Sequence, residues 1–130
     1  MKNDSALVVS GSFRDRDGRV YREQDRVFRG LSSTALENYR KLEKTGFYQA
    51  LLESGKIIGT RDLPEEENPL PAAIQSQWTG FLEHATVPVI SYPYEWSFGM
   101  LRSAALLQLD LVDQAISNGF ALKDATPYNI

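Results

Sequence analysis

The sequence contains no cysteine and only one histidine, His84, among its 130 residues. The absence of cysteine excludes a disulfide, a thiolate nucleophile and a zinc site built on thiolates. Any metal site would have to be built mainly from carboxylates. The N-terminus lacks the pattern of a secretory signal, and a chain without cysteine is indifferent to the redox state of its compartment, so we expect a cytoplasmic protein.

A surplus of positive charge and a long uncharged apolar run are missing as well. Fourteen Lys and Arg residues stand against 17 Asp and Glu, which gives a net charge of −3 and a pI near 5.1. This charge provides no field for binding phosphate backbones, so nucleic acid is not an expected partner. The longest apolar segment, residues 98–116, is interrupted by Arg102, Asp110 and Asp113. A membrane span is therefore not expected.

The residues that are present predict a folded α+β domain. Hydrophobic residues make up 42% of the chain and aromatic residues 11%, which is enough for an ordinary core. Residues 6–10 are rich in strand formers, and the segments 19–22 and 26–29 alternate apolar and charged residues. Such alternation is typical of an antiparallel sheet with one face toward solvent.

Helix signals follow the predicted sheet. One of residues 32–34 can cap a helix, and Thr34 and Glu37 have the spacing of a capping box. Gly46 predicts a break in the helical pattern. Gly55 is suited to the left-handed conformation that ends many helices.

The middle of the chain predicts a mixture of short elements. We expect a short strand at residues 56–58 and an exposed acidic loop at 64–71. Apolar residues at helical spacing predict a helix over residues 71–85, which places His84 at its end. Residues 87–92 are rich in strand formers and predict another strand, at an edge because of its proline.

The strongest helix signal lies near the C-terminus. Ser97 can cap a helix over residues 98–116 in which two apolar stripes predict burial on most of the circumference. Gly119 predicts its end, and residues 120–122 predict a short strand.

The segment after this helix has the order of residues found in a phosphotransferase catalytic loop. There an Asp accepts the proton of the attacking hydroxyl, and an Asn five residues later binds Mg²⁺. Asp124 and Asn129 have this spacing, and Lys123 can reach a transferring phosphate. Leu122 stands where kinases usually carry a histidine. Asp113 and Asn118 have the same spacing in a helical context, which shows that the spacing also occurs by chance. A plain turn at Asp124 therefore remains the alternative interpretation.

Two further sets of residues are candidates for nucleotide binding. Gly11 and Ser12 lie between strand-like segments and can offer backbone N–H groups to phosphates, with a hairpin glycine as the alternative. Arg29 can pair with Glu37 or Glu43, as a strand lysine pairs with a helix glutamate in kinases. A surface ion pair is the alternative there.

Several segments also carry a resemblance to a known family. They are residues 10–15, 20–29, 45–48, 87–98 and 122–130, and together they span nearly the whole chain. The sequence resembles the N-terminal region of a bacterial family of class I SAM-dependent methyltransferases that is related to a nodulation protein.

The resemblance implies a truncated protein-kinase-like fold. Residues 1–60 would form the sheet-and-helix lobe, and residues 71–130 the mainly helical part that ends in the catalytic-loop-like segment. A small antiparallel sheet with packed helices would correspond to the N-lobe and the start of the C-lobe. The methyltransferase domain and its SAM would belong to a part of the parent protein that these 130 residues do not contain.

Three functions follow from these observations. The chain would be a substrate- or nucleotide-recognising region of a larger methyltransferase-like protein, inactive by itself and in contact with the rest of its parent chain. It would alternatively be an active or degenerate phosphotransferase that uses ATP and Mg²⁺. The third possibility is a non-catalytic interaction module.

Overall fold

The structure is a computed structural model, and it describes residues 8–9, 12 and 14–124. The chain divides into two compact units, Met1–Thr86 and Val87–Ile130. The first unit extends beyond the lobe expected at residues 1–60 because later strands complete its sheet.

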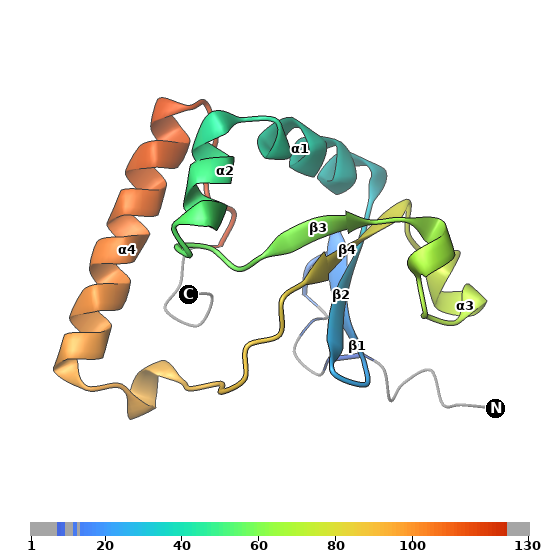
Figure 1. The fold of residues 1–130 in the computed structure, drawn as a ribbon, viewed down its shortest axis with the longest axis horizontal. Helices are drawn as coiled ribbons and strands as arrows, with labels where there is room; N and C mark the ends of the chain where they lie inside the picture. Colours follow the sequence, from blue (N-terminus) through green and yellow to red (C-terminus); the bar gives the residue numbers. More distant parts are fainter. Residues whose placement is uncertain (1–7, 10–11, 13, 125–130) are drawn as a thin grey trace. The chain divides into compact units, whose positions relative to one another are not determined.

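A four-stranded antiparallel sheet forms the centre of the first unit. Its strands are β1 (Gly18–Glu23), β2 (Arg26–Leu31), β3 (Thr60–Leu63) and β4 (Gly80–His84), and they lie in the order β1-β2-β4-β3 (Figure 1). The predicted pairing of the first two strands is confirmed. The chain turns between them at Gln24, which has a φ of 54°. Val8 forms an isolated β-bridge with Tyr21. Val8 and Val9 are the described residues of the strand predicted at residues 6–10.

Two consecutive helices connect β2 to β3. They are α1 (Ser33–Glu43) and α2 (Gly46–Glu53), and the predicted break at Gly46 is confirmed. Ser32 caps α1, because its hydroxyl accepts a hydrogen bond from the Ala35 N–H at 3.3 Å. The capping box expected at Thr34 and Glu37 is therefore wrong.

The end of α2 follows the sequence prediction. Gly55 has a φ of 68°, a left-handed conformation that glycine adopts without steric cost. The backbone N–H groups of Gly55 and Lys56 bond back to Leu52 and Leu51.

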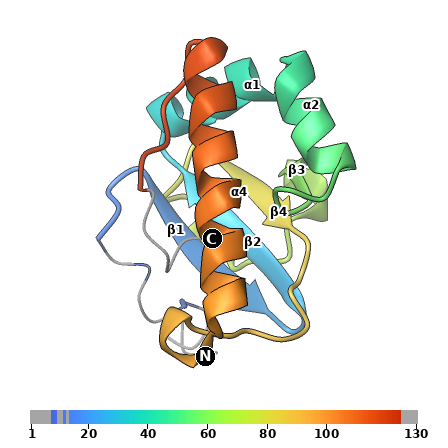
Figure 2. The ribbon, with the colours of Figure 1, turned by 90° about the vertical axis from the view of Figure 1, so that its left-hand side faces the viewer.

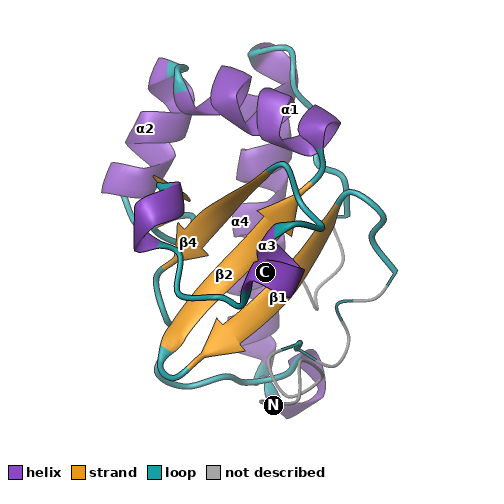
Figure 3. Ribbon diagram, turned by 90° about the vertical axis from the view of Figure 1, so that its right-hand side faces the viewer, coloured by secondary structure: helices purple, strands orange, loops and turns teal. Residues whose placement is uncertain are grey.

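One face of the sheet packs under the short helix α3 (Ala72–Gln75), as Figure 3 shows. We call it the α3 face. Its core contains Tyr21, Phe28, Leu63, Leu70, Ile74 and Phe81, with Val8 and Trp78 at its margin. Trp78 lies directly over Gly30 and donates a hydrogen bond from its indole N–H to the Tyr21 hydroxyl at 2.7 Å.

The opposite face of the sheet packs against α1, and we call it the α1 face. Leu31 and Leu82 of the sheet form a second core cluster with Leu36 of α1. Because side chains alternate along a strand, Arg29 and His84 lie on this same face. The sheet is thus apolar at one end of the α1 face and polar at the other.

The helix expected at residues 71–85 is wrong in its second half. Only Ala72–Gln75 is helical, and Gly80–His84 forms an inner strand paired on both sides. In the strand, Phe81 is buried on the α3 face and Leu82 on the α1 face. A strand covered on both faces needs consecutive apolar residues, and so short a run cannot be told from a helix by its period.

Three short strands expected from composition are not formed. Residues 56–58 follow the cap of α2, and the strand begins only at Thr60, where His84 is its partner. Residues 87–92 pair with no strand among the described residues and lead into the 3-10 turn η3 (Pro93–Glu95). The backbone N–H of Phe120 donates to the Ala115 carbonyl, so residues 120–122 begin as a helix cap.

The main element of the second unit is the long helix α4 (Phe98–Ser117), which Figure 2 shows from the side. Ser97 caps it and Gly119, with a φ of 80°, follows its end, as predicted. The expected burial on most of its circumference is wrong, because Ala115 is the only residue of α4 that is buried. In the described part of this unit there is no second helix of comparable length and no strand to cover a second stripe. None of the described helices is both long and apolar enough to cross a membrane.

Candidate functional site

The polar end of the α1 face is formed by Arg29, Thr60 and His84. Cross-strand register places Thr60 of β3 opposite His84 of β4, and Arg29 of β2 lies diagonally next to His84. Diagonal neighbours in a sheet are within reach of long side chains. Three strands that are distant in sequence therefore bring a cation, a hydroxyl and an imidazole together.

Thr60 fixes the orientation and the tautomer of the His84 ring. The Thr60 hydroxyl donates its single proton to the Ile58 carbonyl at 3.1 Å. It also lies 2.8 Å from Nδ1 of His84; with the hydroxyl proton directed at the Ile58 carbonyl, the imidazole N–H is on Nδ1 and donates to Thr60. The other ring nitrogen, Nε2, is then an acceptor, and it is buried with no hydrogen-bond partner among the described residues.

The surroundings of His84 favour its neutral form. Burial of the ring, together with the nearby positive charge of Arg29, lowers the pKa of His84 to about 4. His84 is thus an uncharged hydrogen-bond acceptor at neutral pH. The structure corrects its predicted place at a helix end, because it closes β4 in the middle of the sheet.

Two tyrosines from the helices extend this polar group. Tyr48 of α2 lies next to Tyr39 and Thr60, and the two tyrosine rings meet edge to face with centroids 6.2 Å apart. Burial is the main reason that the pKa of Tyr48 lies above its usual range. Tyr48 thereby lies beside Thr60, the residue that contacts the ring of His84.

Arg29 has an unsatisfied donor on this face. Its Nε is buried and has no hydrogen-bond partner in the part of the chain that the structure describes. The ion pair expected with Glu37 or Glu43 is not formed among those residues. Glu37 is exposed and lies 4.0 Å from Lys41, while Glu43 lies near the tyrosines at the end of α1. The residues of α1 that face the sheet are Ala35, Leu36 and Tyr39, so α1 provides no acid to Arg29.

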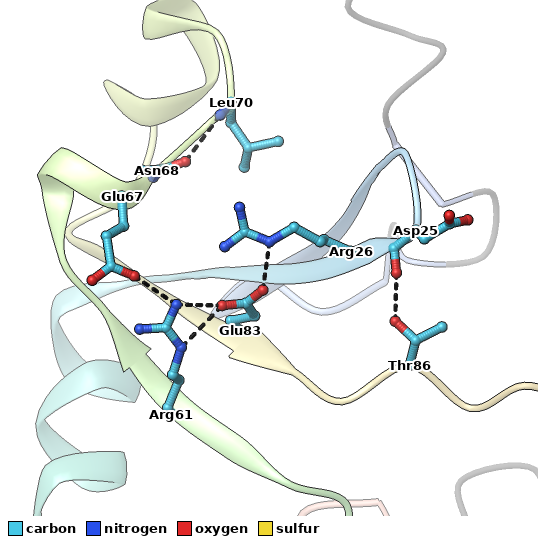
Figure 4. A network of polar contacts seen from close by, with 8 residues as sticks. All are labelled: Asp25, Arg26, Arg61, Glu67, Asn68, Leu70, Glu83 and Thr86. Atoms are coloured by element: carbon cyan, nitrogen blue, oxygen red, sulfur yellow. Dashed lines mark hydrogen bonds and ion pairs between the residues drawn. The ribbon is translucent and has the colours of Figure 1, made fainter.

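A second polar group lies on the α3 face and is fully paired (Figure 4). Glu83 accepts hydrogen bonds from Arg26 at 2.6 Å and from Arg61 at 2.6 and 3.0 Å. Arg61 also donates to Glu67 at 2.7 Å. The bonds from Arg26 are the main reason that the pKa of Glu83 falls to about 2. The charges of two arginines and two glutamates balance each other in this group. The group connects three strands and the turn η2 (Glu65–Glu67), which indicates a structural role.

A shallow hollow of about 370 Å³ lies at the end of β3 and β4, beside this network. Arg26, Arg61 and Glu83 line it together with Thr60 and His84. The charged members are satisfied by one another, and Thr60 and His84 are the lining residues that belong to the α1 face; Arg29 does not line the hollow.

The other predicted site residues are distributed over both units of the chain. Ser12 has a structural contact, since its hydroxyl accepts a hydrogen bond from the Val20 N–H at 2.8 Å. Gly11 lies outside the described residues, as does Asn129. Lys123 and Asp124 are exposed at the end of the described part of the second unit. Within the described ranges, no three His, Asp or Glu side chains are grouped so as to hold a metal ion.

Sequence reasoning missed Thr60 and misplaced His84. Thr60 is the first residue of the strand β3, which the sequence pattern did not indicate, and the pattern placed His84 in a helix. The available signal was the two-residue period of Leu82 and His84, which puts both on the face that also carries Arg29.

Comparison with known proteins gives one informative match. Nodulation protein NoeA of Rhizobium meliloti (strain 1021) is 40% identical to this chain over 126 residues. The match covers 94% of this chain and only 25% of NoeA, so the chain spans about a quarter of the length of the curated relative. No family model matches the sequence, and no solved structure matches it.

This result corrects the resemblance drawn from the sequence. The expected membership of a SAM-dependent methyltransferase family is wrong, because no methyltransferase family model matches and the relative is named only for nodulation. The similarity to a nodulation protein is what the comparison supports.

Proposed function

We propose that this chain is a recognition region of a larger protein and that it binds a nucleotide, or another small molecule carrying phosphate, on the α1 face. A single observation carries the proposal: the buried Nε of Arg29 has no acceptor among the described residues. An unsatisfied buried donor costs about 1 to 3 kcal/mol, and more when it is charged. A phosphate oxygen that reaches the guanidinium would remove this cost through a charge-assisted hydrogen bond.

His84 supports a ligand with mixed chemistry. Its Nε2 is a buried acceptor next to the cationic donor of Arg29. A molecule that offers both an acceptor and a donor would satisfy both groups. A simple inorganic anion would satisfy only Arg29. Nucleotides carry both kinds of group, which is why they are the preferred ligand class.

The arrangement of strands supports a finer proposal about the fold. Counting the bridge at Val8, three successive antiparallel segments precede the helices, and β4 then inserts between β2 and β3. Arg29 lies on the third of these segments, on the face that α1 covers. We propose that the first unit corresponds to the small lobe of a kinase-like fold, in which a strand cation faces the nucleotide.

Phosphotransfer is the second candidate function. Lys123 and Asp124 are exposed shortly after α4, in the order that the sequence predicts for a catalytic loop. If this function is correct, Asp124 would accept the proton of the attacking hydroxyl and Asn129 would hold Mg²⁺. In a longer protein that contains this region, Asp124→Ala would then abolish phosphate transfer and leave ATP binding intact.

The binding proposal is tested by calorimetric titration of ATP, with and without Mg²⁺, into the 130-residue chain. Arg29→Met should weaken binding about tenfold or more, as expected for the loss of a charged hydrogen bond. Arg22→Met is the matched control, because Arg22 lies on the same face of the neighbouring strand and is exposed. Absence of ATP binding by the folded chain, or equal losses in both variants, would refute the proposal and favour an interaction module.

A further inference from the structure

The helix α4 carries an exposed apolar stripe. The stripe consists of Phe98, Leu101, Ala105, Leu109 and Ile116, all of which are exposed. Phe98 is 81% exposed, Leu109 66% and Ile116 65%. At about 100° per residue, the five side chains fall within an arc of about 80° around the helix axis. Large apolar side chains gathered on one face are typical of a surface that packs against a partner.

Two opposite charges flank this stripe on the same side. Arg102 and Asp113 project within about 20° of each other around the axis, next to Leu109. They are about 16 Å apart along the helix, too far to pair with each other. Neither forms an ion pair or a hydrogen bond with any described residue. The helix therefore presents one unpaired cation and one unpaired anion beside an apolar surface.

The positions of these charges are symmetric about the middle of the helix. Arg102 and Asp113 lie at equal distances on either side of the point between Leu107 and Gln108. A two-fold axis through that point relates two antiparallel copies of α4 and keeps the flanking side chains on the same side. Arg102 of each copy then lies opposite Asp113 of the other. The apolar ends also match, because Phe98 comes opposite Ile116.

We propose that α4 is a self-association surface through which two copies of this chain pair as antiparallel helices. The occupant is a second copy because the stripe is complementary to itself in both charge and apolar pattern. A parallel two-fold pair would place this flank of the two copies on opposite sides of the interface, so that neither Arg102 nor Asp113 would meet an opposite charge. The antiparallel pair contains two intermolecular ion pairs and a continuous apolar contact along helices about 30 Å long. The proposal is independent of ligand binding on the α1 face.

Sedimentation velocity of the chain at increasing concentration tests the association. We expect a monomer–dimer equilibrium, and a monomer at every concentration would overturn the proposal. Charge reversal by Arg102→Asp or Asp113→Arg should weaken the dimer about tenfold, because each places two pairs of like charges in contact. The double variant Arg102→Asp/Asp113→Arg restores opposite charges and should restore the dimer. Single variants that associate like the unaltered chain would also refute the antiparallel pairing.

Cross-linking tests the helix direction directly, because the chain has no cysteine of its own. In the antiparallel pair, position 109 of one copy lies about 5 Å along the axis from position 109 of the other, whereas position 98 lies about 28 Å from its counterpart. Mild oxidation should therefore link Leu109→Cys into a covalent dimer and leave Phe98→Cys unlinked. Both residues are exposed on the same stripe, so each controls for the other. Efficient linking of Phe98→Cys would indicate a parallel pair and overturn the inference.

Discussion

Gly30→Ala is the change that tests the packing of the first unit most directly. A Cβ atom at position 30 would lie 2.4 to 2.8 Å from three atoms of the Trp78 ring. Real Cβ contacts are not this short, so the indole must move. The indole also donates to the Tyr21 hydroxyl and packs on the core of the α3 face, so it cannot move without loss.

The expected cost of Gly30→Ala is about 3 kcal/mol in the free energy of unfolding. Overpacking of a well-filled core costs about 1 to 3 kcal/mol, and loss of the hydrogen bond between Trp78 and Tyr21 adds about 1 kcal/mol. Gly46→Ala is the matched control, because no atom lies within 4 Å of its added methyl group. At the first position of α2, alanine should be neutral or should stabilise the chain by up to about 1 kcal/mol.

Urea denaturation followed by circular dichroism measures both variants. A second measurement uses the double variant Gly30→Ala/Trp78→Leu, in which the smaller side chain leaves room for the methyl group. The two changes should then cost at least about 1 kcal/mol less than the sum of the single effects. Equal stabilities of Gly30→Ala and Gly46→Ala, or simple additivity in the double variant, would refute the packing argument.

Three further predictions concern the same sheet. Gly80→Ala should cost about 1 kcal/mol in urea denaturation, less than Gly30→Ala, because the nearest atom, at 2.7 Å, is a methyl group of the flexible Leu36 side chain. His84 has a folded-state pKa of about 4, below its ordinary 6.5, so its contribution to stability is complete above pH 6.5 and is lost as the pH falls toward 4. Urea denaturation at pH 7 and pH 5 should differ by about 2 kcal/mol, and His84→Gln should remove most of that difference. Glu83→Gln should destabilise the chain at pH 7 by about 1 kcal/mol, because it removes a carboxylate whose pKa of about 2 reflects bonds from Arg26 and Arg61. High salt should reduce the loss for Glu83→Gln, since these groups are partly exposed to solvent, and an undiminished loss would contradict the ionic explanation.

Local signals in the sequence were sufficient for several elements. The hairpin of β1 and β2 follows from alternation, and the ends of α2 and α4 follow from Gly55 and Gly119, which have positive φ values. These predictions held because the deciding physics lies within a few neighbouring residues: the period of side chains, or the conformational freedom of glycine.

The same local signals failed where a partner strand decided the conformation. Residues 80–84 form a strand because β2 and β3 pair with them on both sides, and no local signal in Phe81 or Leu82 distinguishes this from a helix. Residues 87–92 have strand-forming composition, but no strand in the described part of the chain pairs with them. Strand formation depends on hydrogen bonds to a second segment, which composition cannot supply.

The candidate site shows the same division. The sequence by itself determined that Arg29 is a cation on a strand, that metal chemistry based on cysteine is excluded, and that α4 carries apolar stripes. Only the tertiary structure decided that Arg29 has a buried donor with no partner among the described residues, and that His84 lies beside it with its ring in contact with Thr60. The physical reason is that charge and periodicity are properties of the chain, whereas desolvation and pairing depend on which distant segments fold against each other.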